Sequence, residues 1–170
     1  MRWDAEVRAA IARWGPRYGV AIDPSLVHAI IERESRHGAA GLVALEPDGD
    51  HSYGPMMVKA STARSQLGVK DPTTLRDPAR GISGGVLYLA WQLKRYAGDT
   101  TAAVAAYNAG SARRTSAGAF INQPYVVAVL GFWNRFKRGA AAAATPALMP
   151  LLLLTLAALL LLRRRRLARG

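Results

Sequence analysis

Hydrophobic residues recur at the helical spacing of three or four positions along most of the chain, and short runs rich in Gly, Pro, Asp and Asn interrupt them. This pattern predicts a mainly α-helical protein with brief connections. The segment 38–55 is instead expected to be a loop, with weak strand potential at 42–45. We expect helices over residues 4–13, 23–38, 59–66, 77–96 and 99–107, and a last helix from Pro124 toward Trp133.

Aspartate and proline mark where several of these helices begin. Asp23, Asp71 and Asp77 each stand directly before a proline, which combines a favoured N-cap residue with a residue suited to the first helical position. Asp99 is a further expected cap. Gly15-Pro16 is expected to end the first helix, because proline disrupts a helix interior.

One charged residue breaks the apolar stripe of the helix predicted over 23–38. Val27, Ile30 and Ile31 form that stripe, and the next position in the series, i+7, is Glu34. Burial disfavours the charged form of a carboxyl group, so we expect the pKa of Glu34 to be raised. Such a group can donate a proton near neutral pH, as glycosidic bond cleavage requires. The structural alternative is a glutamate paired with Arg or Lys at the edge of the core.

The last thirty residues differ from the rest in composition. The 24 residues of segment 139–162 carry no charge. As a helix they would span about 36 Å, slightly more than the hydrocarbon core of about 30 Å. We therefore expect a domain over 1–138, a transmembrane helix over 139–162 and a basic tail over 163–170. A buried Ala/Leu helix in a soluble protein is the alternative.

The flanks of this segment favour the membrane interpretation. Phe132, Trp133 and Phe136 precede it and are expected to form an interfacial aromatic belt, and five arginines follow it. The excess of arginine after the segment modestly favours a cytoplasmic C-terminus. The first residues have charges of both signs where a signal peptide needs an apolar stretch, so no signal peptide is expected.

The formal net charge is +12, of which five positive charges belong to the tail, leaving +7 for the rest of the chain. A basic surface attracts polyanions such as cell-wall polymers, anionic lipids or nucleic acid. No nucleic-acid partner is expected, because the aromatic residues follow helix stripes and do not alternate with basic ones. The chain has no cysteine, which excludes disulfides and thiolate metal sites. The three histidines lack metal-ligand spacing and are expected at the surface or in loops, so no metal is expected.

Several short segments resemble one enzyme family. Val27-xx-Ile30-Ile31-xx-Glu34-Ser35, Tyr53-Gly54-Pro55-Met56-Met57-Val58 with Thr62-Ala63, and Ala106-Tyr107-Asn108-Ala109-Gly110 occur in order, together with Gly81-Ile82-xx-Gly84-Gly85-xx-Tyr88-Leu89 and Pro124-Tyr125-Val126. Together they are similar to the lytic transglycosylases related to goose-type lysozyme, over about residues 12–130. The resemblance implies a lysozyme-like helical domain and, as partner, the glycan strands of peptidoglycan.

The resemblance also implies a mechanism and a site. Glu34 would protonate the glycosidic oxygen between N-acetylmuramic acid and N-acetylglucosamine, then as carboxylate accept the proton of the muramyl 6-hydroxyl, which closes a 1,6-anhydro ring. No cofactor is implied. The family usually has glutamine where Met57 stands, which removes one polar contact to the sugar. The substrate-binding residues implied are Ser35, Tyr53, Met56, Met57, Tyr107, Asn108 and Tyr125.

Three alternatives stay open. A second carboxylate among Glu46, Asp48 and Asp50 would allow hydrolysis, as ordinary glycosidases use two, although acidic residues beside Pro and Gly are typical turn formers. A non-catalytic virion or membrane component could retain the fold, and Ser35, Tyr107, Asn108 and Tyr125 could have purely structural roles. The predicted location is the virion membrane of a bacteriophage or the bacterial cell envelope, with a role in phage entry or lysis.

Overall fold

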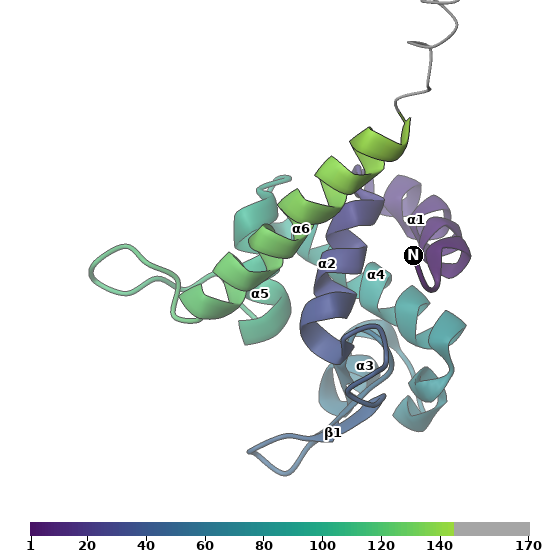
Figure 1. The fold of residues 1–170 in the computed structure, drawn as a ribbon. Helices are drawn as coiled ribbons and strands as arrows, with labels where there is room; N and C mark the ends of the chain where they lie inside the picture. Colours follow the sequence, from purple (N-terminus) through teal and green to yellow (C-terminus); the bar gives the residue numbers. More distant parts are fainter. Residues whose placement is uncertain (145–170) are drawn as a thin grey trace, which may run out of the picture. The chain divides into compact units, whose positions relative to one another are not determined.

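The computed structural model describes residues 1–144, and a mainly helical unit, Met1–Phe136, contains nearly all of the described chain (Figure 1). The second unit, Lys137–Gly170, is described only over residues 137–144, which are helical. The elements are α1 (Asp4–Tyr18), α2 (Pro24–Ser35), β1 (Val43–Leu45), β2 (His51–Tyr53), β3 (Val58–Lys59), α3 (Ala60–Leu67), the 3-10 helix η1 (Pro72–Arg76), α4 (Pro78–Arg95), α5 (Thr100–Ala109) and α6 (Gln123–Ala144).

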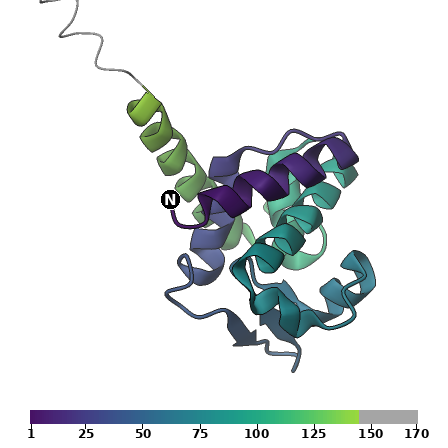
Figure 2. The ribbon, with the colours of Figure 1, turned by 90° about the vertical axis from the view of Figure 1, so that its right-hand side faces the viewer.

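Helix α4 is the centre of the packing. It contacts α1, α3, α5 and η1, and α1 lies along it in the view of Figure 2. Ile82, Val86, Leu89 and Leu93 follow one another at helical spacing and are all buried. Their stripe forms one hydrophobic core with the buried faces of α2, α5 and α6.

The predicted N-caps are confirmed. The carboxylate of Asp23 accepts a hydrogen bond from the backbone N–H of Ser25 at 2.8 Å, Asp77 caps α4 and Asp99 caps α5 in the same way. Asp71 caps the short helix η1. These bonds satisfy backbone donors that have no partner inside the helix.

The prediction that the first helix ends at Gly15-Pro16 is wrong. Helix α1 continues through Pro16 to Tyr18 and ends at Gly19, which has φ of 66°. The additional turn packs Trp14 and Tyr18 against the core, and the Trp14 indole N–H donates to Ser83 Oγ at 3.0 Å. Tertiary packing therefore outweighs the local cost of proline.

Residues 43–59 contain a small antiparallel sheet of order β1-β2-β3. Ala44 pairs with Ser52, and Tyr53 pairs with both Val43 and Val58. The strand potential at 42–45 is confirmed, but β2 and β3 were expected to be loop or helix. Strands of two or three residues are too short to produce a clear alternation of apolar and polar positions.

Helix α6 begins close to the expected Pro124 and runs past Trp133 to Ala144. Phe132, Trp133 and Phe136 are partly buried and pack against the core, and the expected interfacial aromatic belt stays a prediction. The Trp133 indole N–H donates to the carboxylate of Asp23 at 2.7 Å. In the stretch that is described, no helix has both the length and the apolar character to cross a membrane. Most of the predicted segment 139–162 lies outside the described residues and stays a prediction.

Candidate active site

Helix α2 carries Glu34 on its last turn, at the end of its buried stripe. Val27, Ile30 and Ile31 have no exposed surface, whereas Glu34 is half-buried. The helix was expected to reach Gly38, but it ends at Ser35 because Arg36 and His37 adopt left-handed conformations with φ of 48° and 50°. The predicted placement of the glutamate on the buried stripe is confirmed.

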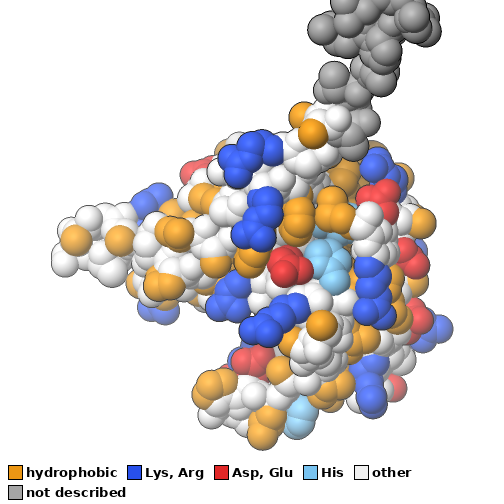
Figure 3. Space-filling view, viewed as in Figure 1, with side chains coloured by type: hydrophobic (Ala, Val, Ile, Leu, Met, Phe, Trp, Pro, Cys, Tyr) orange, Lys and Arg blue, Asp and Glu red, His pale blue; other side chains and the backbone are white. Residues whose placement is uncertain are grey.

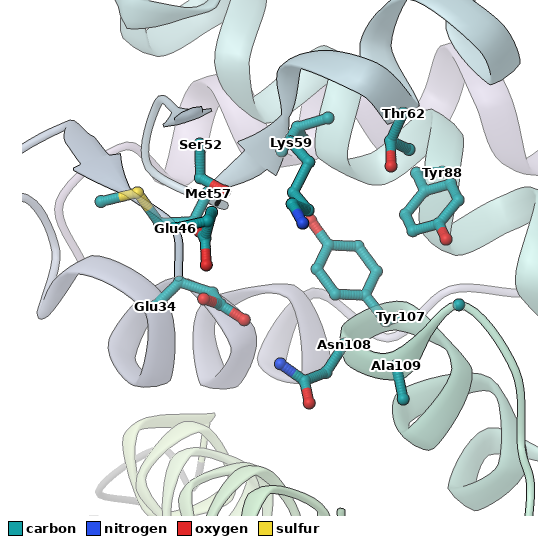
Figure 4. A pocket seen from close by; sticks show the side chains of 12 residues that line it. Glu34, Glu46, Ser52, Met57, Lys59, Thr62, Tyr88, Tyr107, Asn108 and Ala109 are labelled. Carbon is teal, nitrogen blue, oxygen red and sulfur yellow. Dashed lines mark hydrogen bonds between the residues drawn. The ribbon is translucent and has the colours of Figure 1, made fainter. Parts of the chain in front are cut away.

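Glu34 opens into a polar cavity of about 370 Å³ between the small sheet, α2 and the end of α5 (Figure 4). This volume lies in the range of sites for small ligands. The cavity is lined by Glu34, Glu46, Ser52, Met57, Val58, Lys59, Thr62, Tyr88, Tyr107, Asn108, Ala109 and Gly110.

The surroundings of Glu34 raise its pKa to about 7. Burial is the largest cause, because it removes water from the carboxylate, and the negative charge of Glu46 acts in the same direction. A hydrogen bond from Tyr125 and the positive charge of Arg33 oppose the rise. The net result is a carboxyl group that exists in both protonation states near neutral pH, as the sequence predicts.

Tyr125 is the direct partner of Glu34. Its hydroxyl donates to Glu34 Oε1 at 2.6 Å, and its side chain comes from the buried face of α6 with 6 % of its surface exposed. Burial and the nearby Glu34 raise the pKa of Tyr125 well above its ordinary value, so the phenol keeps its proton and remains a donor. Tyr125, which the resemblance implied as a site residue, therefore contacts the carboxyl group of Glu34 directly.

Ser35 lies behind the cavity wall and has no exposed surface. Its hydroxyl donates to the carbonyl oxygen of Pro55 at 2.8 Å and accepts the backbone N–H of Gly38 at 3.2 Å. A fully buried side chain cannot contact a substrate in this arrangement. Ser35 therefore joins the end of α2 to the segment that enters β3.

Met56 and Tyr53 also lie outside the cavity lining. Met56 has no exposed surface and packs on Gly85, where an added Cβ would come within 2.4 Å of the sulfur. Tyr53 stacks on the ring of His51 and packs on the second, smaller cluster of hydrophobic residues. The burial of Met56 therefore does not support its predicted contact with substrate.

Met57, Tyr107 and Asn108 do line the cavity. Met57 adopts a left-handed conformation with φ of 45°, which is rare for a residue with a side chain. The Tyr107 hydroxyl donates to the carbonyl oxygen of Met56 at 2.9 Å, so Tyr107 serves the core and the cavity together. Asn108 Oδ1 accepts from the side-chain amide of Asn122 at 2.9 Å.

Of the three acidic residues considered as a second carboxylate, only Glu46 faces the cavity. The hydroxyl of Ser52 donates to Glu46 Oε1. Asp48 pairs with Lys59 at 2.6 Å. Asp50 accepts the backbone N–H of Ser61 at 3.1 Å, and bonds with Ser61 lower its pKa to about 2.

Sequence reasoning missed Ser52 and Lys59 as cavity residues. Ser52 faces the cavity because Ala44 pairs with Ser52, which puts Glu46 and Ser52 on one face of the β1–β2 hairpin. That register depends on the hairpin turn, which the composition of the segment does not specify. No sequence signal distinguishes Ser52 from an ordinary loop serine.

One histidine differs from expectation. His28 is fully buried and not at the surface; its ring lies 3.2 Å from the Asp4 carboxylate and 3.3 Å from the ring of His37. His37 in turn pairs with Glu32 at 2.8 Å. Across residues 1–144, no group of three or more His, Asp or Glu side chains is arranged to hold a metal ion.

A protein-family model matches more than half of the chain. The model described as the transglycosylase SLT domain matches residues 11–120, which is well over half of the chain. The matched region includes Glu34 and all residues that line the cavity, and it ends before Tyr125.

Proposed function

The chain belongs to the transglycosylase SLT domain family, which acts on peptidoglycan, and from this premise we propose that it is a lytic transglycosylase using Glu34 as its only catalytic acid and base. The bond cleaved is the β-1,4 bond between N-acetylmuramic acid and N-acetylglucosamine. The observation that carries the proposal is the half-buried Glu34 carboxyl in a polar cavity, with a pKa of about 7.

In the first step the Glu34 carboxyl gives its proton to the glycosidic oxygen as the bond from that oxygen to muramyl C1 breaks. In the second step the Glu34 carboxylate takes the proton of the muramyl 6-hydroxyl, whose oxygen bonds to C1. The acid is regenerated and no water is consumed. A pKa near the working pH suits a group that acts first as acid and then as base.

Tyr125 supports the second half of this cycle. A hydroxyl that donates to the carboxylate stabilises the charged state, and its 2.6 Å separation from Glu34 Oε1 fixes the orientation of the carboxyl group. Burial has the opposite effect and favours the protonated acid. The acid step and the base step both depend on the balance between burial and this hydrogen bond.

Glu34→Gln tests the proposal, because glutamine keeps the shape but cannot donate an acidic proton. We expect loss of clearance of purified peptidoglycan, with Glu6→Gln in α1 as a matched control that keeps activity. Mass spectrometry of the products should find 1,6-anhydromuramic ends, which are lighter by one water than reducing ends. Unchanged clearance by Glu34→Gln would eliminate Glu34 as the acid.

Hydrolysis is the second candidate function, and the position of Glu46 favours it. Glu46 shares the cavity with Glu34 and is oriented by Ser52, so it could activate a water molecule as the second carboxylate of a muramidase. Reducing muramic acid as the main product, lost in Glu46→Gln, would establish hydrolysis. Anhydro products that persist in Glu46→Gln would exclude it.

We propose in addition that residues 139–162 anchor the enzyme to a membrane, either of a phage virion or of the cell envelope. The support is the uncharged stretch of 24 residues followed by a run of arginines. The full chain should sediment with membranes, whereas a chain ending at residue 138 should not. Detection of the protein in purified virions would separate the two settings.

A further inference from the structure

Arg33 is an exposed cation beside the acid without a carboxylate partner. It directly precedes Glu34 in α2, and its guanidinium lies over the ring of Tyr125, 5.4 Å from the ring centroid. The ion pairs found in the described part of the chain involve Arg8, His28, His37 and Lys59, and none involves Arg33. Basic side chains gather on the face that includes α2 and α6 (Figure 3).

The aromatic contact holds the guanidinium in place without using its hydrogen-bond donors. A cation over an aromatic face is attracted by the ring, while the N–H groups at its edge stay available. The hydroxyl of the same ring donates to Glu34 at 2.6 Å. The ring of Tyr125 thus lies between the Arg33 guanidinium and the Glu34 carboxyl group. The guanidinium N–H groups remain available to bind a carboxylate.

Two other cations that lie at the cavity lining are already engaged. Lys59 lines the cavity but pairs with Asp48 at 2.6 Å. Arg95 donates to the carbonyl oxygen of Gly110, a residue of the lining, at 3.0 Å. Among these side chains Arg33 has the most uncommitted donors.

The substrate supplies an anion close to the bond that is cleaved. The glycan backbone of peptidoglycan is neutral, but each muramyl sugar carries an acidic stem peptide through the lactyl ether on its O3. The sugar that contributes C1 to the scissile bond therefore bears carboxylates. Resting on the proposed function, we propose that Arg33 binds a stem-peptide carboxylate of the muramyl residue at the cleavage site, which makes this a transglycosylase selective for glycan with free peptide carboxylates.

Two substrates from one batch of sacculi test this inference. Both are freed of phosphate-containing wall polymers, and in one the peptide carboxylates are converted to neutral amides. The native enzyme should have a kcat/KM roughly tenfold higher on the untreated substrate, the size expected of one charge-assisted hydrogen bond at a partly exposed site. Arg33→Gln should lose this preference, so that its kcat/KM is the same on the two substrates.

Arg13→Gln is the matched control, because Arg13 is also exposed and also lies over an aromatic ring, that of Trp14 at 4.6 Å, on a helix that does not line the cavity. It should keep the native preference. Arg33 also lowers the pKa of Glu34. That influence changes kcat/KM by the same factor on both substrates, so it cancels in the ratio of the two values.

The inference is overturned if Arg33→Gln keeps the preference, or if it lowers kcat/KM equally on both substrates. It is also overturned if the effect of Arg33 appears only on sacculi that retain phosphate polymers, since the anion bound would then be a phosphate. These results differ from failure of the proposed function, in which Glu34→Gln would clear peptidoglycan as well as the native enzyme.

Discussion

The hydroxyl of Tyr125 lies 2.6 Å from the carboxylate of Glu34, although the two residues are 91 positions apart in the sequence. This bond joins the last turn of α2 to the first turn of α6. It opposes the rise in the pKa of Glu34 that burial causes. The state of the proposed catalytic acid therefore depends on a side chain from the far end of the domain.

Tyr125→Phe should raise the pKa of Glu34 above about 7, because it removes a donor to the charged form. We expect kcat/KM to fall roughly ten- to a hundredfold, in line with the loss of a positioned catalytic hydrogen bond. The descending limb of the pH profile, which follows loss of the Glu34 proton needed in the first step, should move toward alkaline pH. An unchanged profile would mean that the hydroxyl does not influence Glu34 during the reaction.

Glu34→Gln should stabilise the fold above pH 7. The pKa of Glu34 is raised from 4.5 to about 7, so the folded state binds its proton more tightly than the unfolded chain does. This tighter proton binding stabilises the folded state fully below pH 4.5, and the stabilisation is lost as pH rises through about 7. At about 1.36 kcal/mol per pKa unit, reduced for partial exposure, glutamine should add roughly 2 kcal/mol at pH 8.

Urea unfolding at pH 8 and at pH 4 measures this difference. The gain should be present at pH 8 and absent at pH 4, while Glu6→Gln should show no such contrast. A gain of the same size at both pH values would indicate a packing effect of glutamine unrelated to ionisation.

Ser35→Ala should destabilise the domain without changing substrate affinity. The substitution leaves the buried Pro55 carbonyl without its hydroxyl donor, whereas the Gly38 N–H keeps its bond to the Ser35 backbone carbonyl. An unpaired buried group costs about 1–3 kcal/mol. Because Ser35 has no exposed surface, KM should stay near the native value. A large increase in KM at native stability would restore Ser35 as a substrate contact.

Two glycine substitutions should act in opposite directions. At Gly85 an added Cβ would lie 2.4 Å from the Met56 sulfur, so Gly85→Ala forces the wall of the cavity to move and should cost about 1–3 kcal/mol. At Gly131 in α6 nothing lies within 4 Å of the added atom, and alanine should add about 0.5–1 kcal/mol of stability. Thermal unfolding of both variants provides the comparison.

Met57→Gln should lower KM for peptidoglycan a few-fold. Met57 lines the cavity, and glutamine has a similar length but adds an amide that can hydrogen-bond to a sugar, worth about 1 kcal/mol. The left-handed backbone at this position stays equally strained in both variants. Initial rates over a range of substrate concentrations measure the change, and an unaltered KM would show that the side chain does not touch the sugar.

The helices could be predicted because their signals are local. Asp23, Asp77 and Asp99 cap their helices through hydrogen bonds to backbone N–H groups two or three residues further along. The stripe of Val27, Ile30 and Ile31 repeats within two turns. The same stripe identifies Glu34 as a carboxylate on a buried face. Each of these features follows from bonds and spacings shorter than about eight residues.

The rest depends on contacts that no local pattern encodes. Helix α1 continues beyond Pro16 because its last turn packs against the hydrophobic core. Ser35 faces inward toward Pro55, twenty residues away, although it neighbours the acid in sequence. Glu46 faces the cavity, and Asp48 and Asp50 do not, because of the hairpin register.

The division has a simple physical basis. Hydrogen bonds inside a helix and at its caps join near neighbours, so residue types and their spacing specify them. A site is instead closed by pairs such as Tyr125 with Glu34 and Tyr107 with Met56, 91 and 51 residues apart. Those pairs form only when whole elements pack, and packing turns a glutamate on a helix stripe into an acid with a pKa of about 7.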